Sequence, residues 1–274
     1  MKLIFHTMGG PTLVTLAEQL WHCRRNGGAI NIPTDGGPAD VDAALEIQRE
    51  AVAISGLDAA GFKVGSTSAE AQKILGTTEP GASPVLVDYF FGSPADIPID
   101  QAHKPAVEGE FALRLACDLP PRDEEYSFGD VRDAVEAVAG AIEVVGSRFT
   151  GGLAGKGRLL TTADFGANIA LAVGPWTTDW KGFDLVAHEV HVSLDGMVRE
   201  SGTGASALGH PLNVLQWLAN KQSQTGRGLL AGEIISTGTC TGLLDVAPGD
   251  SLAANFGTLG AVEISFTELS FQAG

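Results

Sequence analysis

The central segment of the chain reads Val107-Glu108-Gly109-Glu110-Phe111-Ala112-Leu113-Arg114-Leu115-Ala116-Cys117-Asp118. Apolar and polar residues alternate along it, with Phe111 on the apolar face and Glu108 and Glu110 on the other. This period of two predicts a half-buried β-strand. Side chains two positions apart on a strand point the same way, about 7 Å apart at ~3.3 Å rise per residue. The pattern therefore places two carboxylates on one face of the strand.

A third glutamate lies in an apolar environment. Glu143 interrupts the run Ala141-Ile142-Glu143-Val144-Val145, which predicts a buried carboxylate in a strand. A buried carboxylate needs a cation, a proton or a hydrogen-bond partner, because leaving it unpaired costs several kcal/mol. Hard divalent cations take oxygen ligands, so one Mg²⁺ or Mn²⁺ ion held by Glu108, Glu110 and Glu143 would account for all three acids. The alternative for the Glu-x-Glu pair alone is a solvated strand face.

The composition limits the partners of the chain. Its 274 residues carry a formal net charge of −16, which argues against nucleic acid and anionic membranes as partners. Hydrophobic residues make up 44%, enough for a large core, and no apolar run approaches the ~18 residues that a membrane span needs. The three cysteines form no C-x-x-C pair, so a disulfide framework or zinc site is not expected. The apolar run after Met1 is too short for a signal peptide, which predicts a cytoplasmic location.

Hydrophobic periodicity predicts an α+β architecture. Helices are expected over residues 11–26, 40–55, 130–140 and 211–223, with a short one between the cap residue Ser68 and Gly76. Strands are expected over 61–65, 107–117, 169–173, 232–237, 251–256 and 261–269, with a hairpin over 185–199 that turns at Asp195-Gly196. No linker or repeat divides the chain. We therefore expect one functional unit over 1–274, with a mainly helical portion (1–60) and a β-rich portion (61–274).

Two charged residues stand out as candidates for proton transfer. Lys63 lies in a short strand between Gly61 and Gly65, and these glycines allow a ligand to approach closely. A lysine partly desolvated there can act as acid or base, and the alternative is a surface lysine whose ammonium reaches solvent. Asp88 interrupts an apolar run and is either a turn cap or a second proton-transfer group.

Two glycine-rich loops are candidates for substrate binding. The segment 201–211 leads into a helix, where backbone N–H groups suit a carboxylate, although it does not match the G-x-G-x-x-G dinucleotide fingerprint. The segment 238–242 follows a strand and can line a pocket. We assign Ser206, His210 and Thr239 to substrate binding, and the alternative is that the loops are plain connectors.

Six segments, taken together and in order, resemble one known group of proteins. They are Gly61-Phe62-Lys63-Val64-Gly65-Ser66-Thr67-Ser68, Val107-Glu108-Gly109-Glu110, Ala141-Ile142-Glu143-Val144, Asp164-Phe165-Gly166-Ala167-Asn168, Leu208-Gly209-His210-Pro211-Leu212-Asn213 and Gly238-Thr239-Cys240-Thr241-Gly242. The chain resembles the 2-keto-4-pentenoate hydratase group of the fumarylacetoacetate hydrolase superfamily, which also contains 4-oxalocrotonate decarboxylases. The resemblance runs from about residue 60 to the end, and the helical beginning fits it as well.

The resemblance implies a mixed β-roll or sandwich fold and a metal-dependent lyase. It carries the metal-ligand role onto Glu108, Glu110 and Glu143 and the acid/base role onto Lys63. Asp88 and Asn168 fall at positions that line the pocket in this group. The implied cofactor is Mg²⁺ or Mn²⁺, and the implied substrate is a small 2-oxo or 2-hydroxy unsaturated acid such as 2-hydroxypenta-2,4-dienoate. A homo-oligomer is expected from the family.

Two other functions stay open at this point. The first is a decarboxylase or C–C bond hydrolase acting on a 2-oxo or β-diketo acid, which would use the same metal site. The second is a non-catalytic protein that binds a metal and a 2-oxo acid. Asn168 motivates the second, because hydratases of this group often carry serine at the aligned position.

Overall fold

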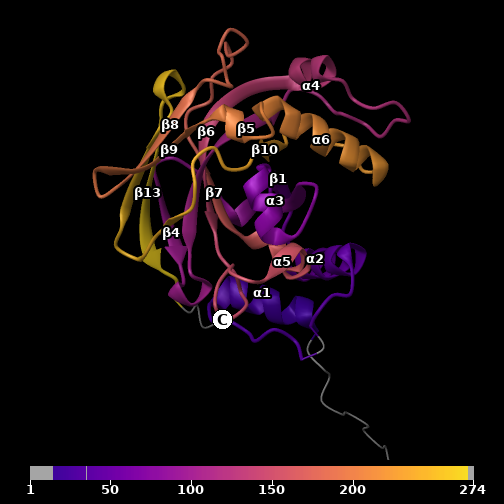
Figure 1. The fold of residues 1–274 in the computed structure, drawn as a ribbon, viewed down its shortest axis with the longest axis vertical. Helices are drawn as coiled ribbons and strands as arrows, with labels where there is room; N and C mark the ends of the chain where they lie inside the picture. The colour runs from indigo at the N-terminus through magenta and orange to yellow at the C-terminus, as the bar shows by residue number, and fades with distance from the viewer. Residues whose placement is uncertain (1–14, 35, 271–274) are drawn as a thin grey trace, which may run out of the picture.

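The computed structural model describes residues 15–34 and 36–270, which form two β-sheets and the helices around them (Figure 1). The larger, eight-stranded sheet has the order β2 (Gly81–Leu86), β1 (Ala59–Gly65), β10 (Ile234–Ser236), β5 (Ala106–Leu115), β6 (Val135–Val145), β7 (Asn168–Val173) and β3 (Phe90–Gly92), and β11 (Leu244–Asp245) also pairs with β5. The smaller sheet has the order β4 (Ala95–Ile99), β13 (Ala261–Glu268), β12 (Ser251–Asn255), β8 (Glu189–Leu194) and β9 (Met197–Thr203). This arrangement confirms the predicted α+β class.

Most of the helices lie at two ends of the molecule (Figure 1). At one end α2 (Val41–Ser55) contacts both α1 (Leu16–Asn26) and α5 (Gly157–Ala163), and at the other α4 (Phe128–Ala134) contacts α6 (Pro211–Gln224). The short helix α3 (Ala69–Leu75) follows β1. Among residues 15–34 and 36–270, none of the helices combines the length and the apolar composition that a membrane span requires.

Capping residues set the helix boundaries. Thr15 and Glu18 form a capping box at the start of α1, so the predicted helix begins there; residues 11–14 lie outside the described part of the chain. Asp40 caps α2 and Ser68 caps α3, each by accepting a backbone N–H. Gly76 ends α3 in the left-handed conformation that glycine adopts without strain. These boundaries confirm the predictions for α2 and α3.

The predicted helix over residues 130–140 is wrong in its second half. Helix α4 ends at Ala134, and the next residue begins β6, which pairs antiparallel with β5 from Leu115↔Val135 to Ala106↔Val145. The valine spacing of this segment suits a helix face, but valine is β-branched and β5 offers a long unpaired edge. Cross-strand pairing therefore overrides the helical pattern.

The prediction that the central strand is half-buried is also wrong. Both faces of β5 are covered, since Phe111 on one face and Ala112 and Glu110 on the other are inaccessible to solvent. The apolar face packs on the smaller sheet, where the Phe111 and Phe256 rings lie 5.9 Å apart. The polar face is enclosed because the larger sheet curls until β2 contacts β7. The alternating sequence pattern shows which face of the strand is polar. Whether that face is buried depends on the curl of the sheet, which the pattern does not contain.

Gly140 allows the two sheets to approach closely. A Cβ atom at this position would lie 2.2 Å from Cδ2 of the buried Phe256 ring. We expect Gly140→Ala to lower the free energy of unfolding by about 3 kcal/mol, because overpacked cores resist extra atoms. Urea denaturation measures the change. The matched control is Gly182→Ala, whose Cβ would meet nothing within 4 Å and which should change stability by less than about 0.5 kcal/mol. Equal stability of the two variants would contradict this account of the sheet contact.

Candidate metal centre

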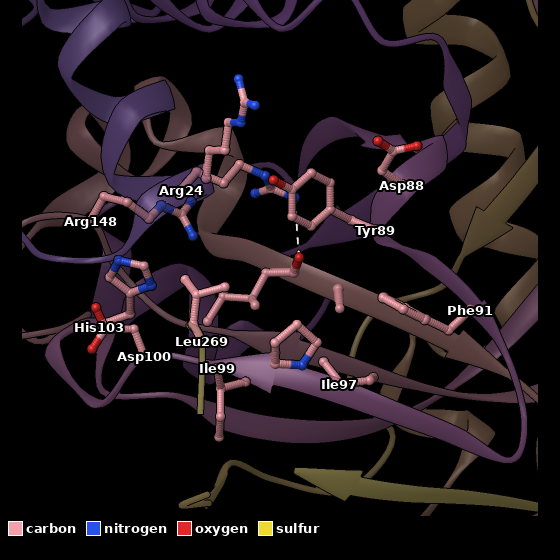
Figure 2. Close-up of a pocket in the computed structure, with 14 residues that line it drawn as sticks. Arg24, Asp88, Tyr89, Phe91, Ile97, Ile99, Asp100, His103, Arg148 and Leu269 are labelled. Atoms are coloured by element: carbon pink, nitrogen blue, oxygen red, sulfur yellow. Dashed lines mark hydrogen bonds between the residues drawn. The ribbon is translucent and has the colours of Figure 1, made fainter. Parts of the chain in front are cut away.

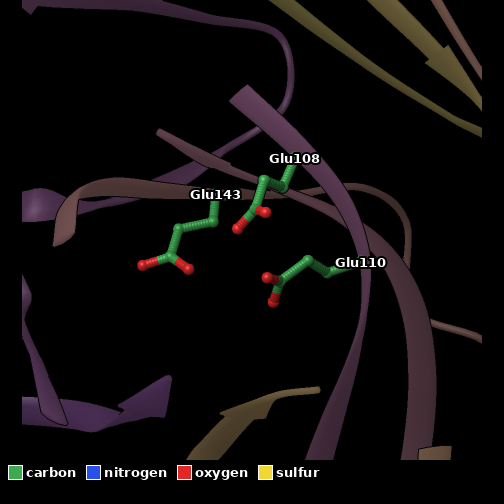
Figure 3. A group of neighbouring side chains, drawn as sticks. All are labelled: Glu108, Glu110 and Glu143. Carbon is green, nitrogen blue, oxygen red and sulfur yellow. The ribbon is translucent and has the colours of Figure 1, made fainter. Parts of the chain in front are cut away.

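Three glutamates converge on the enclosed face of the larger sheet. Glu108 of β5 pairs directly with Glu143 of β6, and Glu110 lies two residues further along the same face of β5. One carboxylate oxygen from each residue lies within 4.8 Å of the others, and Figure 3 shows the side chains pointing toward a common space. The predicted convergence is confirmed, because antiparallel pairing brings one acid of β6 opposite the two acids of β5.

Several carboxylate oxygens of the cluster already have donors. Glu110 Oε2 accepts hydrogen bonds from Ser236 Oγ and from the Gly238 backbone N, the latter at 3.0 Å. Glu143 Oε1 accepts one from Asn168 Nδ2 at 2.8 Å. Among the described residues, the buried Glu110 Oε1 and Glu143 Oε2 have no hydrogen-bond partner.

Oxygens that are buried and unpartnered on converging carboxylates are the donor set that a hard divalent cation prefers. The residues present therefore fit Mg²⁺ or Mn²⁺. The fixed hydrogen bonds to the other oxygens of Glu110 and Glu143 hold both side chains in place while leaving these two oxygens available.

Crowding changes the acidity of the cluster. Burial, and then the charge of Glu143, raise the pKa of Glu108 to about 7, although Lys63 opposes the shift. Burial and the two neighbouring carboxylates raise the pKa of Glu110 well above its usual range. Without a cation, the cluster therefore retains protons at neutral pH that a bound cation would displace.

These raised pKa values predict how the metal-free protein responds to pH. Between about pH 4.5 and about 7 the folded protein binds more protons at Glu108 than the unfolded chain does, because folding raises the pKa of this carboxyl above the usual glutamate value of 4.5. The free energy of unfolding in the presence of a chelator should therefore fall as pH rises through this window. Urea denaturation at a series of pH values measures the slope, and saturating Mg²⁺ should remove it. Stability that rises with pH in the chelated protein would contradict the pKa assignment.

Lys63 is buried beside the cluster. It lies in β1, which pairs with β10 through Lys63↔Ser236, and β10 in turn pairs with β5, so its side chain shares the enclosed face with the glutamates. Its Nζ is 3.5 Å from Glu143 Oε1, and the residue is 5% exposed. This position excludes the alternative of a surface lysine whose ammonium reaches solvent. A buried ammonium next to the carboxylates can hold or donate a proton there.

Asn168 also belongs to the cluster. It begins β7, is fully buried, and donates to Glu143 through its carboxamide. Thr239, in the loop after β10, lies close enough to Glu108 for its hydroxyl to lower the pKa of that carboxyl. Both residues therefore lie beside the glutamates, and their contact with a substrate stays a prediction.

Three other predicted site residues lie elsewhere or have local contacts. Asp88 is exposed on the 3₁₀ turn Val87–Tyr89 and lines a separate cavity of about 70 Å³, shown in Figure 2. Ser206 is exposed on the 3₁₀ turn Gly204–Ser206. His210 caps α6, because its Nδ1 accepts from the Leu212 backbone N at 2.9 Å. The structure does not show these three residues in contact with the glutamates, and their roles stay predictions.

Cys240 is not suited to nucleophilic chemistry. Burial, and then the charge of Glu110, raise the pKa of its thiol far above the usual range. A thiol that remains protonated is a poor nucleophile.

Two polar residues of the N-terminal helices support the site and were not singled out by sequence reasoning. Arg24 of α1 donates to Asn168, and Gln48 of α2 donates to Ser83 Oγ at 2.9 Å. Ser83 pairs with Lys63 across β1 and β2. A signal existed, since both Arg24 and Gln48 occupy positions on the apolar stripe of their helices, where a polar side chain must be buried and satisfied.

The fold and the site together define an α+β protein with an enclosed carboxylate cluster that can hold a divalent cation. The family model described as "Fumarylacetoacetate (FAA) hydrolase C-terminal" matches residues 79–267. The chain therefore belongs to the fumarylacetoacetate hydrolase family, which confirms the resemblance seen in the sequence.

Curated relatives share most of the chain. It is 30% identical to 2-keto-4-pentenoate hydratase from Burkholderia vietnamiensis, over 94% of this chain and 98% of that protein. It is 32% identical to the enzyme of the same name from Paraburkholderia xenovorans, over 91% and 93%. A solved structure of 4-oxalocrotonate decarboxylase from Pseudomonas putida G7, complexed with magnesium and adipate, superimposes with a TM-score of 0.82 at 26% identity, covering 91% of this chain and 95% of that one.

Proposed function

We propose that this protein is a metal-dependent hydro-lyase that adds water to a short 2-hydroxydienoate or 2-oxo-enoate such as 2-hydroxypenta-2,4-dienoate. Glu108, Glu110 and Glu143 hold Mg²⁺ or Mn²⁺ in this proposal. The observation that carries it is the enclosed cluster, whose carboxylates converge within 4.8 Å and leave two buried oxygens without partners. Similarity to named hydratases over more than nine-tenths of the chain supports the choice of reaction.

A bound divalent cation supplies Lewis-acid polarisation of the substrate's 2-oxo group and charge compensation for its carboxylate. The chain's own residues handle the protons. The dienol loses its 2-hydroxyl proton and gains one at C5, which gives the enone. Water then adds with its hydroxyl at C4 and a proton at C3. Lys63 can hold or deliver a proton at this cluster, because its ammonium is buried beside Glu143.

The charge of the site suits a small acid as substrate. A chain with a net charge of −16 repels anions on average, so an anionic substrate needs local positive charge. The cation and Lys63 provide this positive charge inside the enclosed face.

We also propose a cytoplasmic location and assembly into a homo-oligomer. Size-exclusion chromatography with light scattering tests the assembly.

Metal-dependent turnover tests the proposal. The purified protein should consume 2-hydroxypenta-2,4-dienoate, followed by ultraviolet absorbance, and should lose this activity after treatment with EDTA and gel filtration. Addition of Mg²⁺ or Mn²⁺ should restore it, and comparing the two ions identifies the better cofactor. Full activity in protein shown by elemental analysis to be metal-free would contradict the proposal. Turnover of any kind would also reject the non-catalytic alternative.

A decarboxylase is the second candidate. The TM-score of 0.82 to 4-oxalocrotonate decarboxylase favours this reaction, because a decarboxylase, which releases CO₂ from its substrate, has the same fold. Metal stabilisation of an enolate serves either reaction. Assaying released CO₂ with 4-oxalocrotonate separates decarboxylation from water addition, and two smaller acids among the products of a β-diketo acid would indicate a C–C hydrolase.

A further inference from the structure

Arg24 brings a buried positive charge from the N-terminal portion toward the glutamates. It lies on α1, is 4% exposed, and its guanidinium lies over the Tyr89 ring at 4.2 Å (Figure 2). Burial, with Arg148 nearby, lowers the pKa of Arg24 to about 9, so the group is still charged at neutral pH. Buried charges are costly unless they are well bonded, so the partners of this guanidinium indicate its role.

Those partners belong to the first two residues of β7. Arg24 Nη1 donates to the Asn168 carbonyl oxygen, and Nη2 donates to Asn168 Oδ1 at 3.0 Å and to the Ile169 carbonyl oxygen at 3.2 Å. Arg148 also donates to the Asn168 carbonyl oxygen, at 3.0 Å. Both arginines therefore bind the backbone carbonyl oxygen of Asn168. Arg24 also binds the Asn168 side chain, through Nη2.

The contact to Asn168 Oδ1 determines which way the carboxamide points. A guanidinium has donors and no acceptor, so it must face the amide oxygen and would clash electrostatically with the amide nitrogen. With its oxygen held by Arg24, the carboxamide presents Nδ2 to Glu143 Oε1 at 2.8 Å. If the amide were flipped, its oxygen would face the carboxylate and repel it.

The hydrogen bond from Asn168 fixes the orientation of the Glu143 carboxylate. It directs Oε1 toward Asn168, which leaves Oε2 as the buried oxygen without a partner among the described residues. Groups that hold a ligand in this way commonly change metal affinity by about 10–100-fold when they are removed. The chain of contacts Arg24–Asn168–Glu143 therefore links α1 to the metal centre.

We propose that Arg24 is a positioning residue for the metal centre: by binding the Asn168 carboxamide oxygen it orients Asn168 to donate to Glu143, and so preorganises that carboxylate for a divalent cation. The inference rests on the proposed function, because it assumes that Glu143 is a metal ligand. It assigns to the helical N-terminal portion a part in cation binding, and it predicts that α1 influences the site without touching the substrate.

A double-mutant cycle on the metal-free protein tests this. Isothermal titration with Mn²⁺, and separately with Mg²⁺, measures the affinity of the wild type, Arg24→Gln, Asn168→Ala and the double variant. Each single variant should bind about 10-fold more weakly. The double variant should lose no more than either single one, because both changes break the same chain of contacts. Arg24→Lys, which retains a charged donor, should recover part of the affinity lost in Arg24→Gln.

The matched control is Arg25→Gln, an exposed arginine on the same helix, which should bind metal like the wild type. Losses that add in the double variant, or unchanged affinity in Asn168→Ala, would overturn the inference. If Arg24→Gln does not retain native circular dichroism, Arg24→Lys replaces it in the cycle, since lysine keeps a charged donor at this position. Wild-type protein that binds neither ion contradicts the proposed function, whereas tight binding in every variant contradicts only the role of Arg24.

Discussion

Glu110→Gln should abolish metal-dependent turnover while making the metal-free protein more stable. The glutamine oxygen can accept the hydrogen bonds from Ser236 and Gly238, as Glu110 Oε2 does, so the local packing survives. The amide nitrogen replaces Oε1, the buried oxygen without a partner among the described residues, and an NH₂ group cannot bind a cation. We expect Mg²⁺ affinity and turnover at fixed Mg²⁺ to fall at least about 100-fold, beyond the usual effect of removing a group that merely supports a ligand.

Stability should change in the opposite direction, because one of three crowded acids becomes neutral. Burial and the charges of Glu143 and Glu108 raise the pKa of Glu110, which shows that the ionised form is disfavoured in the metal-free cluster. We expect the free energy of unfolding in EDTA at about pH 8 to rise by about 1 kcal/mol. Urea denaturation and calorimetric titration with Mg²⁺ measure the two effects.

The control for this pair of effects is Glu136→Gln. Glu136 lies on the neighbouring strand β6, and its half-exposed side chain pairs with Arg114 Nε at 2.9 Å. Loss of this surface pair should change stability by less than about 1 kcal/mol and leave metal affinity unchanged. A Glu110→Gln protein that still binds Mg²⁺ like the wild type would show that Glu110 is not a ligand.

Lys63→Met should separate catalysis from metal binding. Methionine fills a similar volume without charge, so the enclosed face stays packed. If Lys63 transfers the proton, turnover should fall by about 10²–10⁴-fold. Mg²⁺ affinity should stay equal or increase a few-fold, because the ammonium 3.5 Å from Glu143 Oε1 competes with a cation for that carboxylate. Steady-state kinetics at saturating Mg²⁺ and calorimetric titration of the metal-free variant measure both.

Lys181→Met is the matched control. Lys181 is half-exposed, and its Nζ lies 3.4 Å from Asp133 Oδ1, not beside the glutamates. It should leave turnover and metal affinity unchanged. Turnover of Lys63→Met within about threefold of the wild type would reject the acid/base role. A parallel loss of metal affinity would instead show that Lys63 supports the fold of the cluster.

The glutamate cluster could be predicted from the sequence because it depends on short-range patterns. Residues two apart on a strand share a face, and an acid in an apolar run needs a partner, so Glu108, Glu110 and Glu143 were predicted to converge. The resemblance selected the same residues, together with Lys63. Their approach to one another in the structure follows from the direct pairing of β5 with β6.

Residues that support the site were harder to find. Arg24 and Gln48 lie on helices near the N-terminus. Each donates a hydrogen bond to a residue more than 100 positions later in the chain, Arg24 to Asn168 and Gln48 to Thr162. Their place on apolar stripes predicts burial, but the sequence does not say which partner each meets. Asp88 shows the converse, since an acid in an apolar run turned out to be exposed on a 3₁₀ turn.

The sequence by itself determined the chemistry that is available: the strand pattern with its two acids, the third acid, the lysine between glycines, and the helix caps. Period and capping act over a few residues, so they can be read locally. The tertiary structure alone decided that β6 takes the segment predicted as a helix, that the curl of the larger sheet buries the polar face of β5, and that α1 reaches the glutamates through Asn168. Each depends on which distant strands and helices compete for the same surface, and that competition is settled by the packing of the whole chain.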